Sequence, residues 1–156
     1  MKVYNLDVVA NSTISGSLNI LPFNTNGSYN GITTYYTSSQ TISFGQLVFI
    51  DSSSLSKLST ASGSAGATSS LFAPAIGISV EPVTINNQGR FLISGIISSG
   101  SWSWTVGRKL YLSKTSGQMT QSVAGYTSGD TVQVVGVALS SNKIFFNPSY
   151  DTLIIT

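Results

Sequence analysis

Apolar residues in this sequence come in short runs that are rich in β-branched and aromatic side chains and end at Gly, Asn, Ser or Pro. Such runs are typical of strands, because these side chains suit a pleated surface and the flanking residues favour turns. No window shows a sustained helical stripe with caps, although one helical turn fits residues 67–74. The pattern predicts an all-β fold, either a small β-barrel or a sandwich.

The predicted strands alternate with turn-rich segments along most of the chain. They lie in 41–51, 74–85, 89–97, 102–113, 130–139, 142–149 and 151–156. Residues 52–70 are small and mostly Ser, Ala, Gly and Thr, which predicts a long surface loop.

The first part of the chain has a different pattern from the rest. Apolar and polar residues alternate there, and Asn-Gly pairs at Asn26 and Asn30 mark turns. The candidates for one buried side are Val3, Val8, Ile14, Leu18 and Ile20. We therefore expect an N-terminal β arm or edge hairpin over residues 1–42, followed by a β-barrel domain over 43–156.

The sequence also contains a faint internal repeat. "GQLVFIDSSSLSKLS" from Gly45 resembles "GRKLYLSKTSGQMTQ" from Gly107, and a Gly-centred apolar strand follows each, with Gly77 and Gly136. "GRFLISG" and "NKIFFNP" come next in the two copies. The repeat predicts two similar β-units related by pseudo-symmetry.

The segment 107–121 holds three of the seven basic residues and partly resembles a phosphate-binding loop. Its spacing does not fit a P-loop, since Lys114 follows a serine and no helical pattern comes after it. A hairpin explains the segment better. Leu110 and Leu112 share one strand face, Gly117 supplies the positive φ of the turn, and the return strand begins at Met119.

Composition excludes several classes of function. Charged residues form 8% of the chain, hydrophobic residues form 41%, and the net charge is +2 with basic residues scattered. Such a chain should fold, but it lacks the clustered Lys and Arg side chains that bind the phosphates of nucleic acid. The sequence has no Cys and no His, so it lacks thiolate chemistry and the commonest general base and metal ligand.

The remaining routes to catalysis are weakly represented. Asp51, Glu81 and Asp130 could supply a carboxylate pair, but Asp51 and Asp130 occupy turn positions. Serine has no histidine to activate it, and the Ser-Lys pairs are adjacent in sequence, so in a strand they point to opposite faces. No calcium-binding Asp pattern is present. We expect no enzyme activity, no cofactor and no metal.

Trp102 and Trp104 are separated by two positions, which places both rings on one face of a strand. Packing in a core or subunit interface is the simpler interpretation. The functional alternative is an exposed aromatic platform that stacks against a sugar.

The chain shows no membrane or export signal. The N-terminal segment has polar residues where a signal peptide is apolar, and the longest apolar runs are too short to span a bilayer. We expect the protein to be made and folded in a cytosol.

Residues 43–150 resemble a module of tailed-bacteriophage virion proteins. The resemblance rests on "SWSWTVGRKLYLSKTSGQMTQ" followed by "GDTVQVVGVALSSNKIFFNPS", and "GQLVFID" and "PAIGISVE" also fit. Similar modules occur in capsid cement (decoration) proteins and in tail fibre or baseplate proteins. The segment "VVANSTISGSLNI" is similar to segments that precede such modules in fibres.

The resemblance implies a structural role in a virion. A small β-domain with an arm favours a cement protein that binds the major capsid protein as a homotrimer on the outer capsid surface and stabilises the shell. The alternative is a tail fibre or baseplate component with a host-glycan-binding tip. Neither role needs nucleic acid, a membrane or a cofactor. The candidate interface residues are Val3, Tyr4, Leu6, Val8, Ile14, Leu18, Ile20, Trp102 and Trp104.

Overall fold

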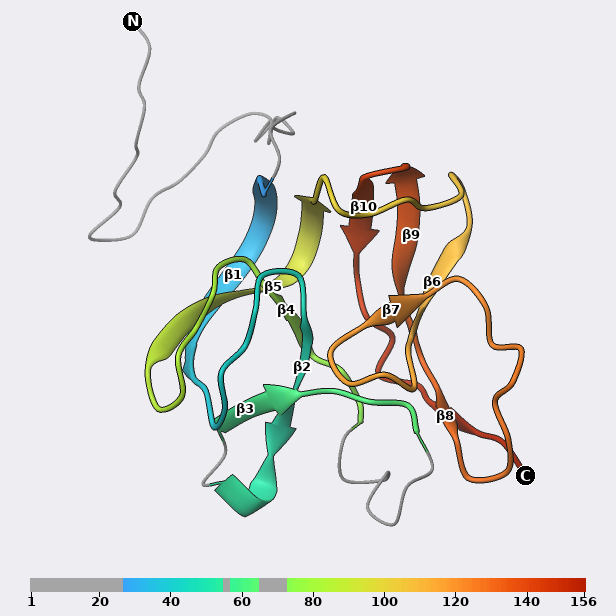
Figure 1. The fold of residues 1–156 in the computed structure, drawn as a ribbon, viewed down its shortest axis with the longest axis horizontal. Coiled ribbons are helices and arrows are strands. Elements are labelled where there is room, and N and C mark those ends of the chain that lie inside the picture. Colours follow the sequence, from blue (N-terminus) through green and yellow to red (C-terminus); the bar gives the residue numbers. More distant parts are fainter. Residues whose placement is uncertain (1–26, 55–56, 65–72) are drawn as a thin grey trace, which may run out of the picture.

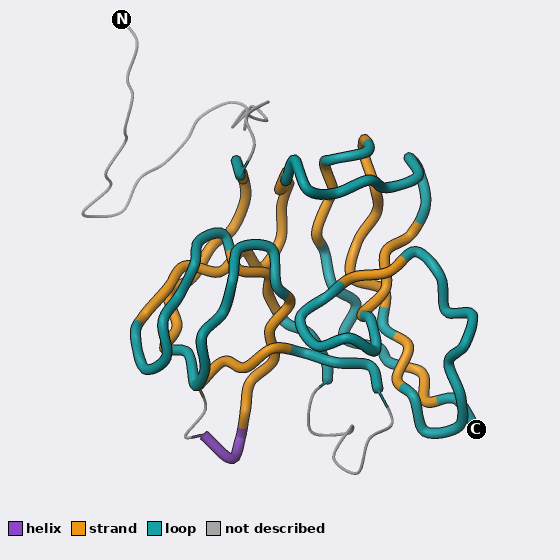
Figure 2. The backbone as a smooth tube through the Cα atoms, in the orientation of Figure 1, coloured by secondary structure: helices purple, strands orange, loops and turns teal. Residues whose placement is uncertain are grey.

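The computed structural model describes residues 27–54, 57–64 and 73–156 (Figure 1). In chain order its elements are β1 (Tyr29–Thr37), β2 (Leu47–Asp51), the 3-10 turn η1 (Ser52–Ser54), β3 (Lys57–Thr60), β4 (Gly77–Ser79), β5 (Gln88–Ser98), β6 (Lys109–Leu112), β7 (Met119–Thr120), β8 (Thr131–Val132), β9 (Val134–Ser140), β10 (Lys143–Phe146) and β11 (Leu153–Ile154). The predicted all-β fold is confirmed, and Figure 2 shows strands joined by loops, with η1 as the one helical segment of the described residues.

Strand β5 is the centre of the sheet. One of its edges pairs with β1 from Gln88 to Ile97. The opposite edge pairs with β4 at Phe91 and Leu92, and then with β10 from Gly95 to Ser98. The sheet therefore branches at β5. One branch continues through β4, β2 and β3, and the other continues through β10, β9, β6 and β7 (Figure 1).

Both branches curl, so that the nine strands of this sheet in the described residues form an open half-barrel. The end of β1 closes onto β3, where Ser38 bridges Leu58 and the Ser39 N–H donates to the Leu58 carbonyl at 2.9 Å. The short strands β8 and β11 pair separately near the C-terminus.

Two apolar cores lie on opposite faces of the sheet. The larger core packs between the two branches. It contains Leu47, Phe49, Ala61, Ala75, Ile78, Val80, Leu92, Ile97, Leu110, Leu112, Val135, Ile144 and Phe146. The smaller core lies on the other face of the first branch and contains Ile42, Val48, Leu58, Val83 and Phe91. Consecutive strand residues such as Leu47 and Val48 therefore enter different cores, because side chains alternate along a strand.

Backbone hydrogen bonds confirm the internal repeat. Gly45 donates to the Ser79 carbonyl at 2.8 Å, and Ser79 donates to the Gln46 carbonyl at 2.9 Å. The second unit reproduces this pattern. Gly107 donates to the Ala138 carbonyl at 2.8 Å, and Ala138 donates to the Arg108 carbonyl at 3.0 Å.

The strand register matches as well. Val48 faces Gly77 in the first unit, and Leu110 faces Gly136 in the second. We call β2 to β5 the first unit and β6 to β10 the second unit.

The hairpin predicted at 107–121 is present. Leu110 and Leu112 are fully buried, Gly117 has φ 74°, and β7 begins at Met119. The Lys114 side chain is 38% exposed, and its Nζ lies 2.7 Å from Oδ2 of Asp130, a carboxylate that is 1% exposed.

The predicted loop at 52–70 is wrong in its middle part. Residues 57–60 form β3, which pairs with β2, and Leu58 is buried. The strand was missed because its neighbours are Ser and Thr, which are buried here through side-chain hydrogen bonds, such as Gln40 Nε2 to Thr60 Oγ1 at 2.6 Å.

Other predictions for this part of the chain are untested. Residues 67–72 of the predicted helical turn and the arm residues up to 26 lie outside the described residues. Of the segment 1–42, residues 29–37 form β1, an edge strand of the sheet.

Candidate functional site

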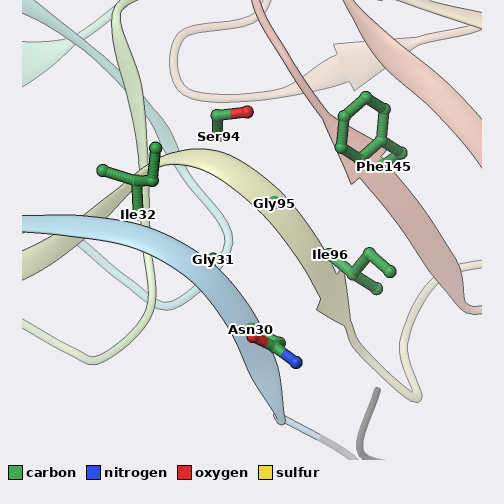
Figure 3. Close-up of a pocket in the computed structure, with 7 residues that line it drawn as sticks. All are labelled: Asn30, Gly31, Ile32, Ser94, Gly95, Ile96 and Phe145. Atoms are coloured by element: carbon green, nitrogen blue, oxygen red, sulfur yellow. The ribbon is translucent and has the colours of Figure 1, made fainter. Parts of the chain in front are cut away.

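An apolar groove crosses the sheet where β1, β5 and β10 lie side by side. It has a volume of about 270 Å³ and is lined by Asn30, Gly31, Ile32, Ser94, Gly95, Ile96 and Phe145. Figure 3 shows the backbone of Gly31 and Gly95 between the side chains of Ile32 and Ile96, with Phe145 on the neighbouring strand. An engineered cavity of about 150 Å³ binds benzene, so this groove can take one large apolar side chain.

The two glycines at the base of the groove are required by the close approach of β1 and β5. A Cβ on Gly31 would lie 2.2 Å from the Ser94 carbonyl oxygen, and a Cβ on Gly95 would lie 2.2 Å from the Asn30 carbonyl oxygen. Both residues have φ near +150°, a region that other residues rarely adopt. A β-bulge in the β1–β5 pairing lies next to them, between Ile32 and Thr33.

The groove continues into a row of side chains that runs across β5, β10, β9 and β6. Phe145 pairs with Ile96 on one side and with Val137 on the other, and Val137 pairs with Lys109. Cross-strand partners share a face, so these side chains lie together. We call Ile96, Phe145, Val137 and Lys109, with Ile32 beside them, the outer face.

The outer face exposes large apolar side chains. Ile32 is 69% exposed and Phe145 is 40% exposed, whereas Phe146 is fully buried. The five strands that meet there, β1, β5, β6, β9 and β10, contain no Asp or Glu, and their lysines are Lys109 and Lys143. The local charge is therefore positive and sparse, which suits an apolar contact more than a charged ligand.

Arg90 lies on the opposite face of β1 and β5, where it contacts two tyrosines of β1. Its guanidinium donates to the Tyr35 hydroxyl and, at 2.5 Å, to the Tyr29 hydroxyl. The guanidinium carbon also lies 5.0 Å from the centre of the Tyr35 ring. The hydrogen bonds to Tyr35 and then to Tyr29 raise the pKa of Arg90, so it remains a cation at every accessible pH.

Trp102 and Trp104 do lie together, but not on a strand. They belong to the loop between β5 and β6, with ring centres 6.1 Å apart and planes tilted by 48°. Both rings are half-buried and pack against the larger core, and Trp102 also lies over Gly45. The Trp104 Nε1 is buried and has no hydrogen-bond partner among the described residues.

The carboxylates considered for catalysis all have structural contacts. Asp51 accepts from Ser54 and Ser59, Glu81 accepts the Arg90 backbone N–H at 2.8 Å, and Asp130 pairs with Lys114. Across the described residues, no group of three or more Asp or Glu is placed to hold a metal ion. In the same part of the chain, no helix is long and apolar enough to cross a membrane.

The structure therefore brings together only part of the predicted interface. The predicted residues from Val3 to Ile20 lie outside the described segments, whereas Trp102 and Trp104 form a pair. Ile32, Ile96 and Phe145 were not predicted to lie together. The available signal was Gly95 inside an apolar strand, since a glycine there often marks a close backbone approach.

Comparisons with known proteins do not assign the chain to a family. No family model matches it, and no curated protein matches it.

Proposed function

We propose that this protein is a structural component of a tailed-phage virion, a cement protein that binds the major capsid protein as a homotrimer on the outer capsid surface and stabilises the shell. The observation that carries the proposal is the outer face, where Ile32 and Phe145 are exposed beside an apolar groove. Clustered exposed apolar side chains typically mark a protein contact.

Two features of the sequence support the same role. Residues 43–150 resemble a virion module, and charged residues form 8% of the chain. A nearly uncharged surface offers little repulsion between copies that must lie close together on a shell. The edge of β1 from Ile32 to Tyr36, which pairs with one neighbour in the described part of the chain, also offers backbone groups to an added strand.

The test is a comparison of capsid particles with and without the protein. Particles of the virus that encodes the chain are stripped of it, and purified protein is added back. We expect it to bind the head and to raise the temperature at which the shell opens, because a ligand of the closed shell stabilises that state. Localisation of the chain to the tail, or no protection against heat, would contradict the proposal.

The N-terminal segment gives a second measurement. Removal of residues 1–20 should abolish binding to the shell if this arm adds as a strand to a capsid or sister subunit. Unchanged occupancy of the truncated protein on stripped particles would exclude that role for the arm.

A tail component that binds a host glycan is the second candidate, favoured by the Trp102–Trp104 pair. Their half-exposed rings could stack against a sugar. Host polysaccharide should then quench the tryptophan fluorescence of the purified protein, and a Trp102→Ala variant should lose most of that response. An unchanged spectrum at saturating polysaccharide would eliminate this candidate.

A further inference from the structure

Arg90, Tyr29 and Tyr35 form a cluster of hydrogen-bond donors on the face of β1 and β5 that lies opposite the groove. Nε of Arg90 donates to the Tyr35 hydroxyl at 3.0 Å, and Nη2 donates to the same hydroxyl. Nη1 donates to the Tyr29 hydroxyl at 2.5 Å. Neither hydroxyl donates to another described residue, so each phenol keeps its O–H for a further acceptor. We call these three residues the donor cluster.

The positive charge of the donor cluster has no carboxylate beside it in the described part of the chain. No Asp or Glu oxygen of the described residues lies within 4.0 Å of the Arg90 guanidinium nitrogens. Glu81 accepts the backbone N–H of Arg90 instead, and neither β1 nor β5 contains an Asp or Glu. The cluster therefore combines an unneutralised cation with unused donors, which suits an anionic ligand.

The number of unused donors matches a carboxylate. A guanidinium has five N–H groups, and Arg90 uses one on each nitrogen to donate to the two phenols. One N–H on each Nη and one O–H on each phenol remain. A carboxylate has two oxygens that accept about four hydrogen bonds, and it has no donor of its own. Its single negative charge also matches the single guanidinium.

The donor cluster lies beside an open edge of the sheet. Strand β1 pairs with β5 along one edge, and its other edge from Ile32 to Tyr36 pairs with no described residue. We call this stretch the free edge of β1. Tyr35 and Arg90 are cross-strand partners, and Tyr35 is 57% exposed. A residue of an added strand directly opposite Tyr35 would therefore extend the same row of side chains.

We propose that the donor cluster binds an acidic side chain of an extended protein segment that pairs with the free edge of β1. The backbone of the segment adds to the sheet, and its carboxylate lies opposite Tyr35 and accepts from Arg90 and the two phenols. The carboxylate also fixes the register, because a slip by one residue would turn it to the other face. The proposal rests on the proposed function only for the identity of the partner, which is then the capsid protein.

The test measures the binding of synthetic peptides to the full-length protein by NMR titration. The probe is a short peptide of alternating Thr and Val with Glu at its centre, which should shift the amides of the free edge and the Arg90 Nε–H. A peptide with Gln in place of Glu should bind at least about tenfold more weakly, because it lacks the charge. A peptide with Pro on both sides of the Glu should also bind at least about tenfold more weakly, because it cannot pair as a strand.

Variants of the protein assign the binding to the donor cluster. Arg90→Ala should weaken binding of the Glu peptide at least about tenfold, and Tyr35→Phe, which removes one O–H donor, about threefold or more. The matched controls are Arg108→Ala, which removes an exposed arginine, and Tyr150→Phe, which removes an exposed hydroxyl, and both should bind as the wild type does. Circular dichroism checks the fold. Arg90→Lys, which keeps the charge without the planar fork, replaces Arg90→Ala if that variant is unfolded.

Several results would overturn this site. They are no binding of any peptide, equal binding of the Glu and Gln peptides, and wild-type affinity in Arg90→Ala. Arg90-dependent binding of polygalacturonate without binding of the Glu peptide would make the ligand an acidic glycan. A wild-type assembly that Arg90→Ala dissociates in gel filtration would make the occupant a second copy. Either of these two results would also overturn the proposal.

The peptide titration separates this site from the role on the capsid. If the Glu peptide binds as expected but the protein is absent from the head, the donor cluster stands as a binding site and the cement role fails. If the wild type and Arg90→Ala protect stripped particles equally, the cement role stands and this site fails.

Discussion

At the scale of single residues, glycines set the distances between strands. Gly77 and Gly136 occupy the same position in the two units, each facing the strand that begins its unit. Their surroundings differ. A Cβ on Gly77 would meet the Leu92 carbonyl oxygen at 3.4 Å, which is an ordinary contact, whereas a Cβ on Gly136 would meet the Phe145 carbonyl oxygen at 2.3 Å.

This difference predicts unequal costs for the same substitution. Gly136→Ala should lower the free energy of unfolding by about 2 kcal/mol or more, because β9 and β10 must separate to admit a methyl group. Gly77→Ala is the matched control and should change it by less than about 1 kcal/mol, since alanine also restricts the unfolded chain. Urea unfolding followed by circular dichroism measures both values, and equal values would contradict the assigned packing.

At the scale of elements, the β6–β7 hairpin is tied to the loop before β8 by a polar cluster. Lys114 pairs with Asp130, and its Nζ lies 5.9 Å from the Tyr126 ring centre. The Tyr126 hydroxyl donates to the Leu112 carbonyl at 2.5 Å. Asp130 also accepts the Thr127 N–H at 2.7 Å, which closes the turn in which both residues lie. The Lys114 charge in this hairpin is therefore paired with a buried carboxylate of the same chain.

Tyr126 makes the stability of this cluster depend on pH. Burial and then the charge of Asp130 raise the pKa of Tyr126 above its ordinary value of about 10. Its contribution to stability is fully present below about pH 10 and is lost as the pH rises through the folded-state pKa, because the unfolded chain loses the proton first.

A Tyr126→Phe variant tests this pH dependence. At pH 7 we expect it to be less stable than wild type by about 1 kcal/mol, because the hydrogen bond to Leu112 is lost. The difference should shrink above pH 10, where only the wild type loses stability by ionisation of this phenol. Tyr150→Phe, which removes an exposed hydroxyl outside the cluster, is the control. Unfolding curves for Tyr126→Phe and wild type that stay parallel from pH 7 to 11 would contradict the assignment.

At the scale of the whole molecule, the two units share one core and one central strand. Leu92 and Ile97 of β5 pack in the larger core with Ile144 of β10, and Phe91 of β5 packs in the smaller core. Neither unit can separate without exposing residues of the other. The protein should therefore unfold in one cooperative step.

Hydrogen exchange tests this cooperativity. The amides of Leu92, Ile97 and Ile144 should exchange with the same opening free energy, equal to that of global unfolding. The amides of Leu153 and Ile154, in the exposed strand β11, should exchange much faster and serve as the internal control. A lower opening free energy for β10 than for β4 would show that the second unit opens alone.

Much of this architecture is predictable from the sequence, for identifiable reasons. The hairpin can be predicted from neighbouring residues, because Leu110 and Leu112 alternate with polar residues and Gly117 suits the turn. The repeat followed from the recurrence of Gly45 and Gly107. By contrast, β3 has polar side chains that become buried through distant partners, and no local pattern reports those partners.

The site was less predictable than the fold. The outer face gathers Ile32, Ile96 and Phe145 from strands far apart in sequence, and the pairing that brings them together depends on the bulge in β5. The prediction that the Trp102 and Trp104 rings lie together is correct, but the prediction that they lie on a strand is wrong. Its position depends on contacts with the core and with Gly45 across the molecule.

The branch at β5 has one further consequence, which concerns the angle between the two units. Because β4 and β10 pair with the same edge of β5, the backbone holds the two units at a fixed angle. The pairing with β10 begins at Gly95, where β5 approaches Gly31 of β1 too closely to admit a Cβ on either residue. A larger residue at either glycine would therefore force the backbones of β1 and β5 apart at the junction of the two units.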